Sequence, residues 1–137
     1  MSDGPPDSDF TREIGMEMGR VEDGVCVIEL ELDARHMSVA QRAHGGVLFT
    51  MLDTAMGRAV ISRLPPGRGC ATVEAKINYL RPIQAGRLRA EGRALDLTRR
   101  TAYAEGTVRD DQGRVLARSS GTFFLTDTIA QSERERV

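Results

Sequence analysis

The sequence lacks an excess of charge of either sign. Its 19 lysines and arginines nearly balance 20 aspartates and glutamates, and the formal net charge is −1. This balance gives the chain no overall attraction to nucleic acid or to an anionic membrane surface, and we expect neither as a partner.

The sequence also lacks a long uncharged apolar run, which excludes a transmembrane helix. Residues 1–9, MSDGPPDSD, have neither the basic flank nor the apolar stretch of a signal peptide. Cysteine is scarce, because Cys26 and Cys70 are too few for a disulfide framework in 137 residues. We therefore expect a cytoplasmic protein with two free, buried thiols.

Several catalytic signatures are missing as well. His36 and His44 are the only histidines, and they lack the one-turn spacing with which two helix residues bind zinc, so we expect no metal ion. No Gly-x-Ser-x-Gly elbow occurs, and the sequence has neither a phosphate loop nor a dinucleotide fingerprint. We expect no cofactor.

What is present fits one domain of ordinary length. Residues 1–9 are polar and rich in turn formers, and residues 129–137 are dominated by charge, so we expect both to be flexible tails. The domain is expected to span residues 10–128.

Apolar periodicity organises this domain. Residues 14–32 alternate on either side of the turn signal at 22–24, which predicts a β-hairpin. A long apolar helix is expected from Gly45 to Arg63, where the prolines and glycine at 65–67 stop it. Four more extended runs follow at about residues 71–81, 86–95, 102–109 and 115–125.

One helix and an antiparallel meander can share a core only if the sheet wraps round the helix. We therefore predict an α+β fold in which a curved antiparallel sheet of about six strands surrounds one long central helix. Small and polar residues gather on one arc of that helix, namely Thr50, Asp53, Thr54 and Gly57. Such an arc suits close approach of a second helix, so we expect a homodimer.

Asp53 is the feature that packing explains least. It lies among apolar helix residues, where an ionised carboxylate costs several kcal/mol unless it is paired, hydrogen-bonded or exposed in a site. The helix opens with His44, Gly45 and Gly46, and glycines there leave backbone N–H groups that can hold an oxyanion. Hydrolysis of an acyl group requires a donor that stabilises the oxyanion, together with a base or nucleophile.

Geometry limits how these two groups cooperate. Asp53 follows Gly45 by eight residues, so at helical rise the two lie roughly 12 Å apart along the axis. One carbonyl cannot contact both on the same helix. We therefore predict that antiparallel packing of two central helices joins the Gly45 N–H of one subunit to Asp53 of another.

These residues resemble the hotdog-fold acyl-CoA thioesterases, particularly the PaaI-like group of the phenylacetic acid pathway. The resemblance covers about residues 25–125. Its most specific part is His44-Gly45-Gly46 with the aspartate nine residues after the histidine. A second part is the segment at 72–82, TVEAKINYLRP, which resembles the strand that follows the helix in these enzymes.

The resemblance implies a hotdog fold and hydrolysis of aryl- or medium-chain acyl-CoA to a free acid and CoA. Asp53 is implied as nucleophile or general base, and Gly45 as the oxyanion donor. His44 would orient the turn or the thioester, and Thr72 would position the attacking water. The resemblance also suggests a tetramer built as a dimer of dimers.

The implied substrate surface combines the helix start with two later segments. Besides Gly46, it comprises Asn78, Tyr79, Arg81, and the turn at 96–100 that carries Arg99 and Arg100. These two arginines match the geometry of nucleotide phosphates, and an ordinary solvated turn is the alternative interpretation.

The sequence departs from the family pattern at two positions. Relatives commonly have Asn six residues before the histidine and Gly three before it, where this chain has Ser38 and Gln41. A shorter Ser38 changes how a thioester carbonyl or the histidine can be held, and Gln41 can substitute from a different position. These departures leave open a non-catalytic acyl-CoA-binding hotdog protein. A hotdog hydratase or dehydratase is a further alternative, which the His-Gly-Gly spacing disfavours.

Overall fold

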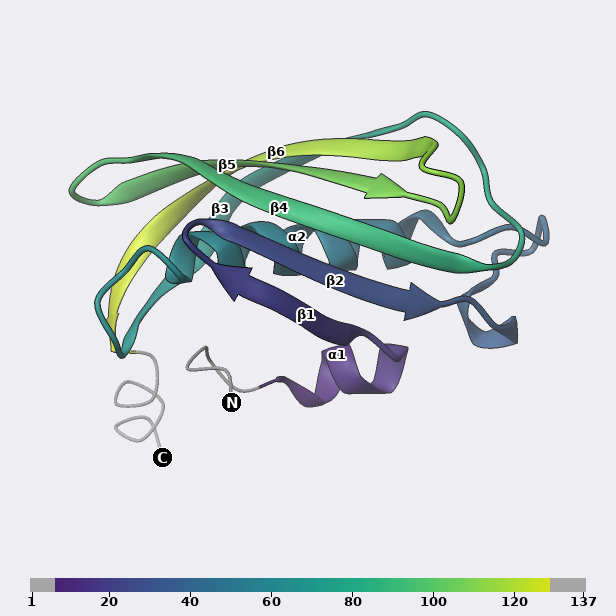
Figure 1. Cartoon of the computed structure of the whole chain (residues 1–137), viewed down its shortest axis with the longest axis horizontal. Helices are drawn as coiled ribbons and strands as arrows, with labels where there is room; N and C mark the ends of the chain where they lie inside the picture. Colours follow the sequence, from purple (N-terminus) through teal and green to yellow (C-terminus); the bar gives the residue numbers. More distant parts are fainter. Residues whose placement is uncertain (1–6, 129–137) are drawn as a thin grey trace.

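The computed structural model describes residues 7–128 and contains a sheet wrapped round one long helix (Figure 1). Its elements are α1 (Asp9–Ile14), β1 (Glu17–Glu22), β2 (Val25–Glu31), the 3₁₀ turn η1 (Ala34–His36), α2 (Gly45–Ile61), β3 (Arg68–Tyr79), β4 (Arg87–Leu97), β5 (Thr101–Arg109) and β6 (Val115–Thr128). The six strands form one antiparallel sheet in the order β1-β2-β4-β5-β6-β3. The predicted fold is confirmed.

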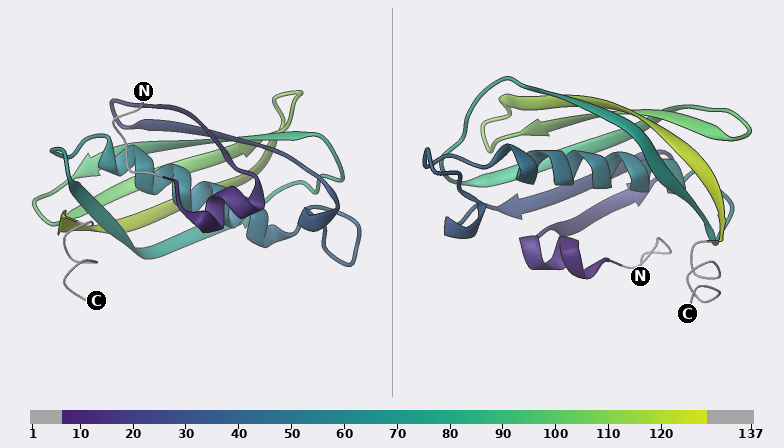
Figure 2. Two further views of the ribbon diagram at one scale, coloured as in Figure 1. Left: turned by 90° about the horizontal axis from the view of Figure 1, so that it is seen from below. Right: turned by 180° about the vertical axis from the view of Figure 1, so that it is seen from behind.

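Helix α2 lies along the concave face of this sheet, while α1 lies at the β1 edge (Figure 2). The predicted helix is confirmed, with its end two residues earlier than expected. No helix within residues 7–128 is long and apolar enough to cross a membrane.

Helix α1 corrects one prediction. Ile14 was expected to begin an extended run, but it closes a short helix that Ser8 caps by accepting a hydrogen bond from the Thr11 N–H. Gly15 ends this helix in the left-handed region, with φ of 90°, and β1 follows. Six residues are too few for a helical period to stand out from the alternation that follows.

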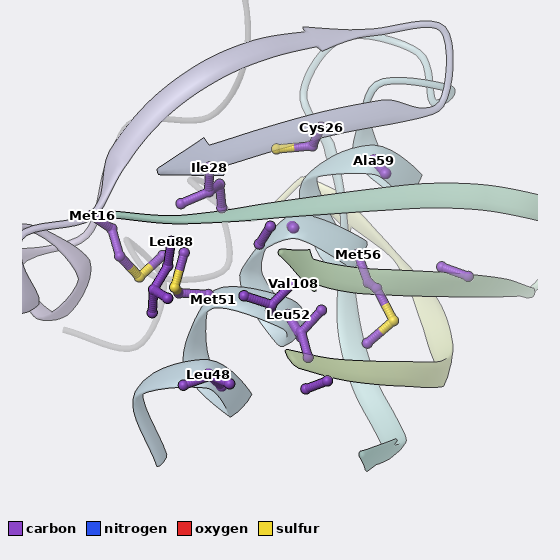
Figure 3. Packing of buried hydrophobic residues seen from close by; sticks show 14 of the residues in the cluster. Met16, Cys26, Ile28, Leu48, Met51, Leu52, Met56, Ala59, Leu88 and Val108 are labelled. Carbon is purple, nitrogen blue, oxygen red and sulfur yellow. The ribbon is translucent and has the colours of Figure 1, made fainter. Parts of the chain in front are cut away.

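The core lies between α2 and the sheet. Met51 and Leu52 of the helix pack with Leu88 of β4 and Val108 of β5, and all four are buried (Figure 3). The closest approach of helix and sheet is at Gly92 of β4, where a Cβ would overlap the backbone of α2 and lie 2.6 Å from the Met56 nitrogen. A glycine is therefore what allows β4 to lie directly on the helix.

Two strands form the edges of the sheet. Strand β1 pairs only with β2, and β3 pairs only with β6. Most side chains of β3 are exposed, and its register against β6 shifts between Thr72 and Glu74. A long exposed edge with unpaired backbone groups is the kind of surface that a second strand completes.

Candidate active site

The turn at the start of α2 contains His44 and Gly45, and contacts in the structure explain why these residue types occur there. His44 caps the helix with an extended backbone, and its Nδ1 accepts a hydrogen bond from the Gly46 N–H at 2.9 Å. A side chain at Gly45 would be a tight fit, because a Cβ would lie 3.0 Å from the Tyr79 ring and hydroxyl and Tyr79 would have to shift by a few tenths of an ångström. As the first helical residue, Gly45 also carries an N–H with no acceptor within the helix. The turn can thus present a backbone donor beside an imidazole.

Main-chain hydrogen bonds fix this turn to its surroundings. The His44 N–H donates to the His36 carbonyl, and the Ala43 N–H donates to the Ile83 carbonyl, both at 2.8 Å. The His36 ring is itself buried, and its Nε2 lies 2.6 Å from the Ile14 carbonyl oxygen. His36 is therefore a structural residue that connects α1 to the loop before the site.

Ser38 and Gln41 lie together in a tight turn just before His44. The Gln41 N–H donates to the Ser38 carbonyl at 3.0 Å, and Ser38 Oγ accepts a hydrogen bond from the Ala40 N–H at 3.3 Å. Gln41 has a φ of 62°, in the left-handed region that favours glycine. A glycine, which the family resemblance led us to expect at this position, would adopt this conformation without strain.

Asp53 and Thr72 are brought together by the packing of α2 against β3. Asp53 is half-buried, and its Oδ1 accepts a hydrogen bond from the Thr72 hydroxyl at 2.8 Å. The carboxylate in the apolar helix is therefore neither unpaired nor fully enclosed. This arrangement avoids most of the cost of an isolated buried charge.

Cys70 lies beside this pair and is a free, half-buried thiol. Its Sγ is 3.6 Å from the Gly57 carbonyl oxygen. Burial, and secondly the negative charge of Asp53, raises the pKa of Cys70 to about 11. The thiol stays protonated near neutral pH, so the polar group available for base or nucleophilic chemistry here is Asp53.

A narrow slot runs from Asp53 between α2 and β3. The slot is closed in this structure: about 140 Å³ lies between its atoms, but none of it has room for a water molecule. Its lining is apolar apart from three residues and consists of Phe49, Leu52, Asp53, Met56, Ala75, Lys76, Ile77 and Ser119. An acyl group could reach Asp53 along this apolar lining only if the side chains of α2 and β3 move apart.

Most of this lining was not singled out from the sequence. Phe49, Asp53 and Met56 stand four and three residues apart on α2, a spacing that places them on one helical stripe. That spacing could have identified Phe49 and Met56 as neighbours of Asp53 from the sequence. Ser119, whose hydroxyl donates to Met56 Sδ at 3.4 Å, carries no comparable signal because its position depends on the register of β6.

Gly45 and Asp53 are both on α2 and are not adjacent. The helix runs without interruption from Gly45 to Ile61, so the axial separation remains roughly 12 Å. The two groups therefore cannot act on one carbonyl from the same helix.

The expected substrate-binding residues are also divided between two ends of β3. Asn78 pairs with Arg118 near the helix start, and the Arg81 guanidinium donates to the Val115 carbonyl at 2.7 Å. Arg100 instead accepts a hydrogen bond at its carbonyl from Leu125, which pairs with Cys70 at the other end of the strand. Cys70 and Asn78 are eight residues apart, or roughly 26 Å along a strand. One protomer does not gather Arg99 and Arg100 with Asn78, Tyr79 and Arg81.

A larger hollow, of about 440 Å³, lies between the loop at 82–87 and the turn at 110–114. Three of its charged side chains have partners in the described part of the chain: Arg87 pairs with Glu17 and Glu29, and Arg114 pairs with Asp110. Neither Asp53 nor the glycine turn lines it. We assign the chemistry to the smaller slot.

The sequence profile described as the thioesterase superfamily matches residues 40–117, which is more than half of the chain. The matched region contains the glycine turn, Asp53 and Thr72. The chain belongs to the thioesterase superfamily.

Similar proteins place this superfamily member near the PaaI proteins. The N33D mutant structure of the phenylacetic acid degradation protein PaaI from Thermus thermophilus is 30% identical, with a TM-score of 0.78, over 85% of this chain and 98% of that one. The smu.793 protein from Streptococcus mutans, solved bound to acetyl-CoA, is 27% identical, with a TM-score of 0.76, over 83% of this chain and 90% of that one. The proofreading thioesterase EntH of Klebsiella pneumoniae is 29% identical over 101 residues, 74% of each chain. The resemblance inferred from the sequence is confirmed.

Proposed function

We propose that this member of the thioesterase superfamily hydrolyses an acyl-CoA to a free acid and CoA. The observation that carries the proposal is the Asp53 carboxylate, which is hydrogen-bonded to Thr72 at 2.8 Å and lines a closed apolar slot. Superfamily membership, the acetyl-CoA found on smu.793 and the name of EntH support thioester substrates. Aryl and medium-chain aliphatic acyl groups both suit an apolar lining.

In the general-base form of this reaction, a water oxygen attacks the thioester carbonyl carbon while Asp53 takes the water proton. The developing oxyanion is stabilised by the Gly45 N–H and the N-terminal end of the α2 dipole. The carbon–sulfur bond then breaks, and the CoA thiolate takes up a proton as the free acid forms. In the nucleophilic form, Asp53 attacks directly and water hydrolyses the resulting anhydride. Thr72 holds the carboxylate in either form.

The roughly 12 Å between Gly45 and Asp53 supports a site completed by a second subunit. Antiparallel packing of two α2 helices, with two β3 edges side by side, would bring the Gly45 N–H of one subunit to Asp53 of the other. The same pairing would bring Arg99 and Arg100 of one subunit toward Asn78 and Arg81 of its partner. We propose a homodimer that shares its sites, assembled into a dimer of dimers. A cytoplasmic location suits its free thiols.

The test is hydrolysis of a panel of aryl- and medium-chain acyl-CoAs. The rate is measured as the release of the free CoA thiol. The variant Asp53→Asn should keep the wild-type oligomer and lose at least about 100-fold in kcat, the size of effect expected on removing a general base or nucleophile. The exposed Asp23, in the turn between β1 and β2, provides a matched control, and Asp23→Asn should hydrolyse at the wild-type rate.

Two outcomes would contradict the proposal. An unchanged kcat in Asp53→Asn would remove Asp53 from the chemistry. Stoichiometric acyl-CoA binding by the wild-type protein without CoA release would make the chain a binding protein instead.

A further inference from the structure

Tyr79 is linked to the helix start rather than left as an exposed surface residue. It is the last residue of β3, and its hydroxyl donates to the Gly45 carbonyl at 2.7 Å. Its ring also packs closely on Gly45, where a Cβ would lie 3.0 Å from it. Burial raises the pKa of Tyr79, so the hydroxyl keeps its proton and remains a donor throughout the neutral range.

The hydrogen bond from Tyr79 is continued through one peptide group. The Gly45 carbonyl and the Gly46 N–H belong to the same planar amide, and that N–H donates to His44 Nδ1 at 2.9 Å. A donor on the carbonyl polarises the amide and strengthens the bond that its N–H makes. Tyr79 therefore acts on the imidazole without touching it.

This chain of bonds determines which ring nitrogen of His44 carries the proton. Because Nδ1 accepts a hydrogen bond, the neutral imidazole must have its proton on Nε2. The His44 side chain is exposed, and no residue within 7–128 is recorded as accepting from Nε2. The Nε2–H is thus available to a ligand oxygen.

We propose that Tyr79 is a positioning residue, which acts through the Gly45–Gly46 peptide to hold His44 as an Nε2–H donor for the thioester oxygen. The inference rests on the proposed hydrolase function and gives Tyr79 a role other than direct contact with CoA. The Gly45 N–H and the His44 Nε2–H would then both serve the oxygen that gains negative charge.

The kinetic test compares Tyr79→Phe with Tyr103→Phe, using an acyl-CoA that the wild-type protein hydrolyses. Tyr79→Phe keeps the ring on Gly45 and removes only the hydroxyl, so kcat should fall about threefold to tenfold, the effect of one lost hydrogen bond, with KM unchanged. Tyr103 is the other tyrosine, and its hydroxyl donates to Glu105 on β5. Tyr103→Phe should retain the wild-type kcat.

A spectroscopic test does not depend on activity. Nitrogen-15 spectra of the histidine rings, with His44 assigned through a His44→Gln variant, should show an unprotonated Nδ1 and a protonated Nε2 in the wild-type protein at pH 8. In Tyr79→Phe, the His44 ring should become a mixture of tautomers while the His36 signals stay in place. A merely structural tyrosine would not move the His44 signals.

The outcomes separate the two proposals. A protonated Nδ1 in the wild-type protein, or identical His44 spectra and kcat in Tyr79→Phe, overturns the role of Tyr79. A wild-type protein that hydrolyses no acyl-CoA refutes the proposed function, and the spectra then still decide whether Tyr79 sets the His44 tautomer.

Discussion

Gln41 shows at the scale of one residue how the turn before the site is stabilised. Its left-handed backbone, with φ of 62°, brings a Cβ close to its own carbonyl. The hydrogen bonds of the turn between Ser38 and Arg42 hold this conformation. The strain is therefore local, and it falls on a residue that is exposed and separate from the slot.

Gln41→Gly should stabilise the protein by about 0.5–1 kcal/mol, because relief of the left-handed strain exceeds the added entropy of an unfolded glycine. Urea unfolding would measure this, with Ala40→Gly, at a neighbouring position, as the control that should lose stability. A less stable Gln41→Gly protein would show that the side chain makes a necessary contact.

Residue-scale features of the site differ in how far the sequence could reveal them. Asp53 stood out because a carboxylate in an apolar stripe needs a reason, and the resemblance paired it with Thr72, which lies within hydrogen-bond distance. The hydrogen bond from the Tyr79 hydroxyl to the Gly45 carbonyl was not predictable, since it depends on where the end of β3 lies relative to the start of α2. The pattern of neighbouring residues in the sequence carries no information about that distance.

At the scale of elements, α2 meets β4 at Gly92, where the helix backbone leaves no space for a Cβ. Gly92 permits this contact, whereas Gly57 on α2 faces Phe123 and Cys70 with room for a methyl group, the nearest atom lying 3.6 Å from a Cβ. A methyl side chain is therefore tolerated at position 57 and excluded at position 92.

Gly92→Ala should destabilise the protein by at least about 3 kcal/mol, because the methyl group would overlap the backbone of α2 and no side-chain rotation can relieve this. Gly57→Ala is the matched control and should gain up to about 1 kcal/mol from helix propensity. Thermal unfolding monitored by circular dichroism distinguishes them. Equal melting temperatures for Gly92→Ala and the wild-type protein would contradict this packing.

Helices and strands were predictable where a periodic pattern of apolar residues extends over many positions. The hairpin, α2 and the later strands follow from apolar spacing and turn residues, with boundaries shifted by a few positions. The burial of Arg58 on α2 was not predictable, because it depends on an ion pair with Asp7, whose Oδ1 lies 3.1 Å away. That contact joins residues 51 positions apart in the sequence.

For the whole molecule, the central question is whether one chain suffices for catalysis. If sites are shared, Asp53→Asn and Gly45→Pro each inactivate both sites of a homodimer by damaging different halves, because proline fits the first helical position but has no N–H to donate. A mixed dimer would contain one site with both halves intact and one with both halves altered.

Co-expression of equal amounts of these two variants should therefore restore about a quarter of the wild-type activity, since half of the dimers are mixed and each has one intact site. Either variant alone should be inactive. Activity of the mixture, measured with acyl-CoA and compared with the sum of the two separate preparations, provides the test. No recovery in a sample shown by mass spectrometry to contain mixed dimers would place the whole site within one chain.

The strand order has a consequence for the time at which the site is assembled. Strand β3 carries Thr72 and Tyr79, yet its only partner in the sheet is β6, which begins 36 residues after β3 ends. During synthesis, β3 must wait for the last strand before its backbone is paired, and such non-local pairing is slow. The half-sites therefore form at the end of folding, so a ribosome-stalled chain that lacks residues 115–128 would have α2 but no support for Asp53.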